Sequence, residues 1–80
     1  MIMDMEKEKN KLVKTLFQQS AKVKTWNDKL ALSITILKLK KLGVFNEAQV
    51  MELRSMYELV SGIWIVAETK VKDKEVKNNE

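Results

Sequence analysis

Very few residues of this chain are of the types that favour tight backbone turns. Proline is absent, and glycine occurs only at Gly43 and Gly62. A β-sandwich or β-barrel needs many tight turns, and glycine and proline supply most of them. A set of packed helices needs only a few such connections. We therefore predict an all-α fold for the 80 residues.

The clearest turn is expected between residues 42 and 46. Gly43 is the residue type preferred just past a helix C-terminus, where the backbone becomes left-handed at no cost from a Cβ atom. Asn46 is a preferred N-cap residue, and Gln49 three positions later completes the spacing of a capping box. These local signals predict that one helix ends at this turn and another begins there.

The predicted fold is a small three-helix domain. Its helices are expected over about residues 5–24, 28–42 and 46–70, and the charged tail over 71–80 is expected to fray. Because the connection at Gly43 is short, the second and third helices should form an antiparallel hairpin at the centre of the domain.

The segment 28–42 is ambiguous. Within it, residues 30–36 alternate in polarity as a strand would, and their isoleucine and threonine residues favour strands. We prefer a helix because two isolated strands seldom form a stable sheet. Such a helix would be apolar nearly all round, so it should lie centrally and be covered by the others. The strand remains the alternative.

The helix expected over 46–70 carries more apolar surface than one neighbour can cover. Its apolar residues recur at steps of three and four, as in a coiled coil, and extend over about half of its circumference. A short chain without disulfides has little stability to spare, which favours a second subunit. We predict a helical homodimer or other homo-oligomer, with the following self-association candidates: Leu53, Tyr57, Val60, Ile63 and Trp64.

The composition argues against catalysis. Histidine and cysteine are both absent, which removes the Ser–His and Cys–His nucleophilic machineries and the commonest metal ligands. The two glycines are too far apart for a phosphate-binding loop. We expect a protein that is not an enzyme, with no catalytic residue, no metal and no cofactor.

Positive charge is concentrated in the first half of the chain. The formal net charge is +4, and residues 1–44 hold ten lysines against four acidic residues. The helix over 5–24 should turn Leu12, Leu16 and Phe17 toward the core. Its opposite side is a candidate surface for a partner or a nucleic acid, although in so lysine-rich a chain a solvated face is the simpler interpretation. This Lys face consists of Lys7, Lys11, Lys14 and Lys22.

Two further residues are candidates for exposed contacts. Trp26 lies near a predicted helix junction, and Ile65 lies on the polar side of the last helix. Together these features favour a small protein–protein interaction module, such as a phage or mobile-element accessory or inhibitor protein that masks a partner's surface. The alternative is a nucleic-acid-associated protein that binds the phosphate backbone through the Lys face.

A membrane protein is not expected. The longest apolar run, residues 62–67, is far shorter than the roughly 20 residues that a spanning helix needs. The first residues lack the basic-then-apolar order of a secretory signal. We therefore expect a cytoplasmic protein.

Overall fold

The computed structural model describes the backbone of residues 2–79 and the side chains of residues 6–72. It confirms the all-α class, since the described residues contain helices and no strand. The predicted number of three helices is wrong, because this part of the chain forms four. They are α1 (Ile2–Ser20), α2 (Trp26–Lys41), α3 (Glu47–Met56) and α4 (Ser61–Asn79).

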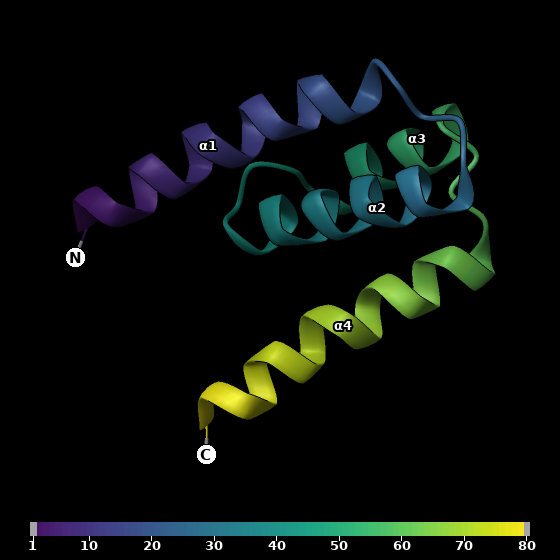
Figure 1. Cartoon of the computed structure of the whole chain (residues 1–80). Helices are drawn as coiled ribbons and strands as arrows, with labels where there is room; N and C mark the ends of the chain where they lie inside the picture. The colour runs from purple at the N-terminus through teal and green to yellow at the C-terminus, as the bar shows by residue number, and fades with distance from the viewer. Residues whose placement is uncertain (1, 80) are drawn as a thin grey trace.

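Helix α2 lies at the centre, as its all-round apolar character predicts. It contacts α1, α3 and α4, whereas those three helices make no close backbone contact with one another in the described part of the chain (Figure 1). Leu32, Ile36 and Leu39 are completely buried on it. Every other helix is therefore held in the domain mainly through α2.

The strand alternative for residues 30–36 is wrong because the polar groups of this segment are satisfied within a helix. Ser33 Oγ donates to the Lys29 carbonyl at 2.8 Å, and Thr35 Oγ1 donates to the Ala31 carbonyl at 3.1 Å. Both residues are buried. A buried hydroxyl without a partner would be costly, and these bonds one turn back remove that cost.

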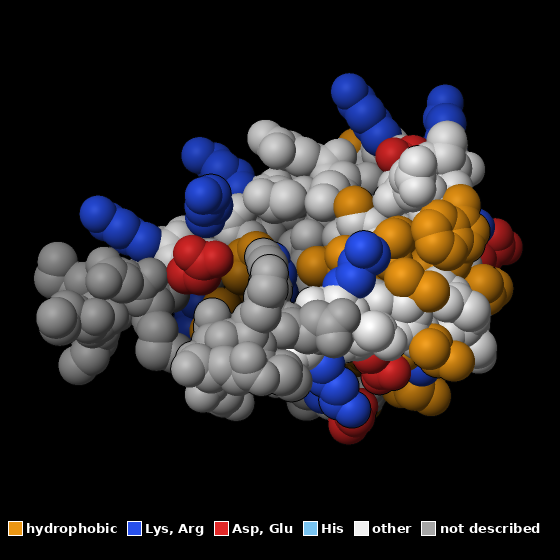
Figure 2. Space-filling model, turned by 60° about the horizontal axis from the view of Figure 1, so that its bottom comes forward, with side chains coloured by type: hydrophobic (Ala, Val, Ile, Leu, Met, Phe, Trp, Pro, Cys, Tyr) orange, Lys and Arg blue, Asp and Glu red, His pale blue; other side chains and the backbone are white. Residues whose placement is uncertain are grey.

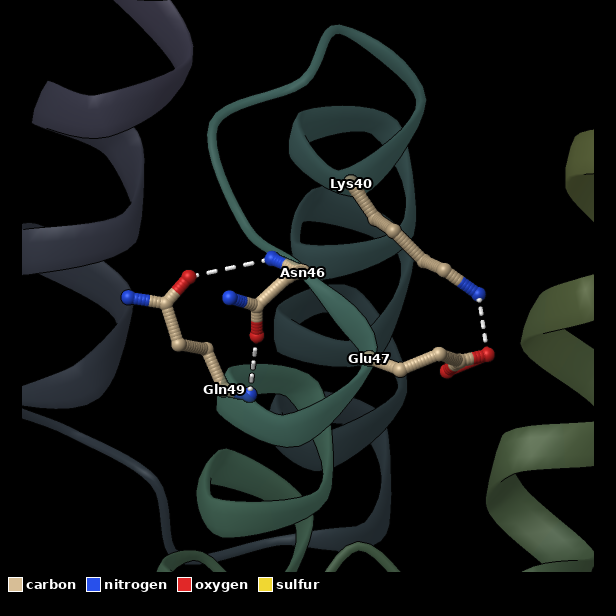
Figure 3. Close-up of polar contacts among 4 residues, drawn as sticks. All are labelled: Lys40, Asn46, Glu47 and Gln49. Carbon is tan, nitrogen blue, oxygen red and sulfur yellow. Dashed lines mark hydrogen bonds and ion pairs between the residues drawn. The ribbon is translucent and has the colours of Figure 1, made fainter.

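The turn between α2 and α3 is built as the sequence predicts (Figure 3). Gly43 has φ +86°, in the left-handed region. Asn46 Oδ1 accepts the Gln49 N–H at 2.8 Å, and Gln49 Oε1 accepts the Asn46 N–H at 3.0 Å, which completes the capping box. Lys40 Nζ also reaches Glu47 Oε2 across the turn at 2.8 Å. The predicted antiparallel hairpin is present only over its first part, as α2 and α3, because its second helix ends at Met56 rather than at residue 70.

The helix predicted over 46–70 is divided at residues 57–60. Glu58 adopts φ +55° and donates its N–H to the Ser55 carbonyl, while the Leu59 N–H bonds to the Arg54 carbonyl at 2.8 Å. This pattern closes α3 as a Schellman motif. The chain then reverses, so α4 runs in the same direction as α2 (Figure 1).

Burial explains why the chain bends there. The bend places Leu59, Ile63 and Trp64 in the core, each no more than 6% exposed. Burying a Leu or Ile side chain contributes about 2 kcal/mol. A left-handed residue with a Cβ costs about 1–2 kcal/mol. Two or three such burials therefore outweigh the strain at Glu58.

The other helix ends differ from the prediction by a few residues. Helix α1 stops at Ser20, before the expected end at 24, and α2 begins at Trp26 rather than 28. Thr25 caps α2 and Asp28 completes its capping box. Helix α4 extends past residue 70 to Asn79. The expected fraying of the tail falls largely on residues 73–80, whose side chains lie outside the described part.

Candidate interaction surfaces

Hydrophobic side chains gather at the end of the molecule away from the two chain termini (Figure 2). At this end α2 and α4 begin and α3 finishes (Figure 1). Five large hydrophobic residues of these helices and of the α3–α4 turn are each more than half exposed. We call them the junction surface: Trp26, Met51, Met56, Val60 and Ile65.

A shallow hollow of 390 Å³ opens within the junction surface between α3 and α4. The only charged residue in its wall is Arg54, whose guanidinium lies over the Trp64 ring, 4.8 Å from the centroid. This cation–π contact ties α3 to α4 and holds Arg54 in place. The hollow is lined by Met51, Arg54, Ser55, Leu59, Val60 and Ser61.

An ion pair connects the junction surface to the start of α2. Lys29 Nζ lies 3.8 Å from Glu58 Oε1, so the first turn of α2 is close to the turn between α3 and α4. The Glu58 side chain is largely exposed, and such a pair contributes little stability. The pair shows that the helical turn of α2 which carries Trp26 and Lys29 approaches the α3–α4 turn.

The self-association candidates do not form one surface. Ile63 and Trp64 are buried within their own chain, 3% and 6% exposed. Leu53 and Tyr57 are partly buried and pack against the same core. Only Val60 is exposed. A continuous coiled-coil seam is therefore absent, because the helix that was predicted to carry it is divided.

The exposed-contact candidates Trp26 and Ile65 are both at the surface, 53% and 60% exposed. The sequence places Met56 only within the broad apolar side of the predicted last helix, and it gives no indication of Met51 as part of a surface. No local signal identifies them, because their exposure depends on where α3 ends and on which side α4 leaves. Methionine side chains are flexible and polarisable, which suits a surface that adapts to a partner.

The Lys face is exposed throughout. Lys7, Lys11 and Lys14 project from α1, and Lys22 lies in the turn just beyond its end. Leu16 packs against the core as predicted, but Phe17 does not, and its side chain is 69% exposed. Within the described part of the chain, helix α1 contacts α2 alone, so it buries a narrower stripe than the sequence predicts.

A second hollow, of 570 Å³, lies where α1 meets α2. Gln19 Oε1 is buried there and accepts no hydrogen bond from a described residue. Backbone N–H donation from Thr25 and then from Lys24 lowers the pKa of Asp28, so this carboxylate is held charged by the cap. The walls are formed by Gln18, Gln19, Ala21, Lys22, Asp28 and Ala31.

A third hollow, of 320 Å³, lies between the end of α2 and α4. Three of its side chains are cationic, but Lys40 is already paired with Glu47. Its lining is Leu37, Lys40, Lys41, Glu68, Val71 and Lys72.

The described residues contain no group of three or more His, Cys, Asp or Glu placed to hold a metal ion. None of the helices in the same part of the chain is long and apolar enough to cross a membrane. Comparison of the chain with protein-family models, with curated proteins and with solved structures gives no match.

Proposed function

We propose that this protein is a non-enzymatic protein–protein interaction module whose partner docks on the junction surface. The observation that carries the proposal is the group of exposed apolar side chains at this end of the molecule, two of which, Met51 and Val60, line the α3–α4 hollow (Figure 2). Exposed apolar residues scattered singly need no explanation, but a contiguous group on a small protein marks an interaction site.

The chemistry of the hollow indicates the kind of partner. Its wall combines apolar side chains with a single cation, Arg54, which is fixed by Trp64. A guanidinium in an apolar wall favours a carboxylate on the other side. We therefore infer a partner protein that presents an apolar ridge with an acidic side chain. By covering that ridge, the module would act as an accessory or inhibitor protein.

Val60→Asp tests this surface without unfolding the protein. The Val60 carbonyl accepts the Trp64 N–H at 2.9 Å, so residue 60 is the N-cap of α4. Aspartate is a preferred N-cap, so the variant should keep or gain stability, by about 0.5–1 kcal/mol. It should nevertheless lose the partner, because the charge enters an apolar contact.

The measurement has two stages. Tagged wild-type protein captures partners from the native cell, and mass spectrometry identifies those that Val60→Asp and Met56→Glu fail to retain. The affinity of the purified partner is then measured directly, with Lys70→Glu at another exposed position of α4 as the control. Equal affinity for the wild-type protein and all three variants would exclude the junction surface.

Self-association through this surface is the alternative, and it would use Val60 rather than Ile63 and Trp64, which are buried in their own chain. Sedimentation at high micromolar concentration distinguishes the two cases. A dimer that Val60→Asp splits would assign the surface to self-association. A monomer would support the use of the junction surface by a different protein.

A further inference from the structure

A segment with lysines and no acidic residue runs from α1 into the turn that follows it. Between residues 9 and 27 the chain has five lysines and neither Asp nor Glu. Lys11, Lys14 and Lys22 of the Lys face belong to this stretch, and all three are exposed. Lys7 differs, because Glu6 and Glu8 flank it. Lys14 is the lysine of this face with no acidic residue within one helical turn, whereas Glu8 lies one turn before Lys11 and Asp28 lines the same hollow as Lys22.

The most exposed large hydrophobic residue that the structure describes lies beside these lysines. Phe17 is 69% exposed and follows Lys14 by three positions, so the two side chains are neighbours on the helix surface. The side chains of residues 6–72 leave most of the ring uncovered. An aromatic ring held in water next to cations offers both a stacking surface and a charge partner.

From these features we infer that this side of α1 binds single-stranded nucleic acid. Lys11, Lys14 and Lys22 would contact phosphates, and Phe17 would stack on a base. Lysines alone attract any polyanion. An exposed aromatic ring adds a stacking contact that an unpaired base makes and a duplex base does not, because bases in a duplex are already stacked. This inference is independent of the junction surface.

The phosphate contacts are tested by salt dependence. Binding of a fluorescent single-stranded oligonucleotide of roughly 16 nucleotides is followed by anisotropy over a range of salt concentrations. Each phosphate contact contributes about −0.7 to the slope of log affinity against log salt for a single strand. The double variant Lys11→Gln, Lys14→Gln should therefore flatten the slope by about 1.4.

A matched control removes the same charge elsewhere. Lys70 and Lys72 are exposed on α4. The double variant Lys70→Gln, Lys72→Gln should retain the wild-type slope. An equal loss in both double variants would show that only net charge matters and would overturn the proposed site. Lys7→Gln should have a smaller effect than Lys14→Gln, because its acidic neighbours already weaken its field.

Phe17→Ala tests the stacking contact and identifies the ligand class. The variant should bind the single strand about tenfold more weakly. Its affinity for heparin, which has charge but no bases, should stay the same. Circular dichroism should not change, because the ring is exposed. Ile65→Ala and Val60→Asp, on the junction surface, should bind the oligonucleotide as the wild-type protein does.

Two results would overturn the inference. One is a wild-type protein that binds heparin or duplex DNA as tightly as the single strand. The other is a Phe17→Ala variant with unchanged affinity for the single strand. Either result would assign the Lys face to general polyanion contact, such as an acidic protein surface.

Discussion

The turns on the two sides of α3 close their helices with the same backbone hydrogen bonds. In each, the residue after the helix cap donates its N–H to a carbonyl three positions back. The following residue donates to a carbonyl five positions back. Each turn also has a left-handed residue, Gly43 after α2 and Glu58 after α3.

The residues that build these turns are very different. Gly43 is suited to the left-handed conformation, and Asn46 caps the next helix with a complete capping box. At the second turn the left-handed residue is a glutamate, and the N-cap position of α4 is occupied by Val60. One turn is therefore specified by its own residues. The other is imposed by the burial of Leu59, Ile63 and Trp64 behind it.

Gly43→Val should break the first turn and have the largest effect. An added Cβ meets no atom within 4 Å, so the cost arises only from the left-handed backbone. We expect a loss of about 2 kcal/mol in the free energy of unfolding, measured by urea titration. Gly62→Ala is the matched control. Gly62 is helical and its Cβ site is also open, so alanine should stabilise by about 0.5 kcal/mol. Equal effects at the two glycines would contradict this account.

Asn46→Ala should lower the free energy of unfolding by about 1 kcal/mol, because the bond from the Gln49 N–H to the Asn46 side chain is lost. Asn46→Ser retains a side-chain acceptor, so its free energy of unfolding should fall by only about 0.3 kcal/mol. Thermal unfolding of the two variants under one buffer measures the difference. If alanine and serine were equivalent, the cap would contribute nothing.

Glu58→Gly should repair the second turn. Relief of the left-handed strain exceeds the extra entropy of glycine in the unfolded chain, so we expect a gain of about 0.5 kcal/mol. Glu58→Ala removes the same contact with Lys29 but keeps a Cβ, and should show no gain. A stabilised alanine variant would mean that the Glu58 side chain, rather than the backbone, carries the cost.

The smallest expected effect is a pH dependence that distinguishes the capping boxes of α2 and α3. The lowered pKa of Asp28 means that its contribution is present above the ordinary value of 3.8 and is lost as pH falls through the lower, folded value. The melting temperatures of the wild-type protein and Asp28→Asn should therefore converge in acid. The neutral Gln49 makes the other box insensitive to pH, and Gln49→Glu should introduce the dependence there. Parallel curves in all variants would argue against a charged cap at Asp28.

The exposure of the candidate surface residues also has local causes in some cases and tertiary causes in others. Helical periodicity predicts the exposure of Ile65 and of the Lys face, whereas Trp26 is a contact candidate because of its place near a predicted helix junction. Phe17 was assigned to the core because the predicted apolar stripe of α1 was too wide for its single neighbour. Ile63 and Trp64 were assigned to a dimer seam, since a continuous last helix would have left them uncovered.

Local sequence determined the all-α class, the central position of α2 and the turn at Gly43. A cap or a left-handed glycine acts within a few residues and contributes about 1 kcal/mol wherever the rest of the chain lies. Only the tertiary structure decided that the chain bends at Glu58, and with it which apolar residues became core and which became the junction surface. Burial depends on neighbours distant in sequence, and at about 2 kcal/mol per large side chain it overrides local preference where the two disagree.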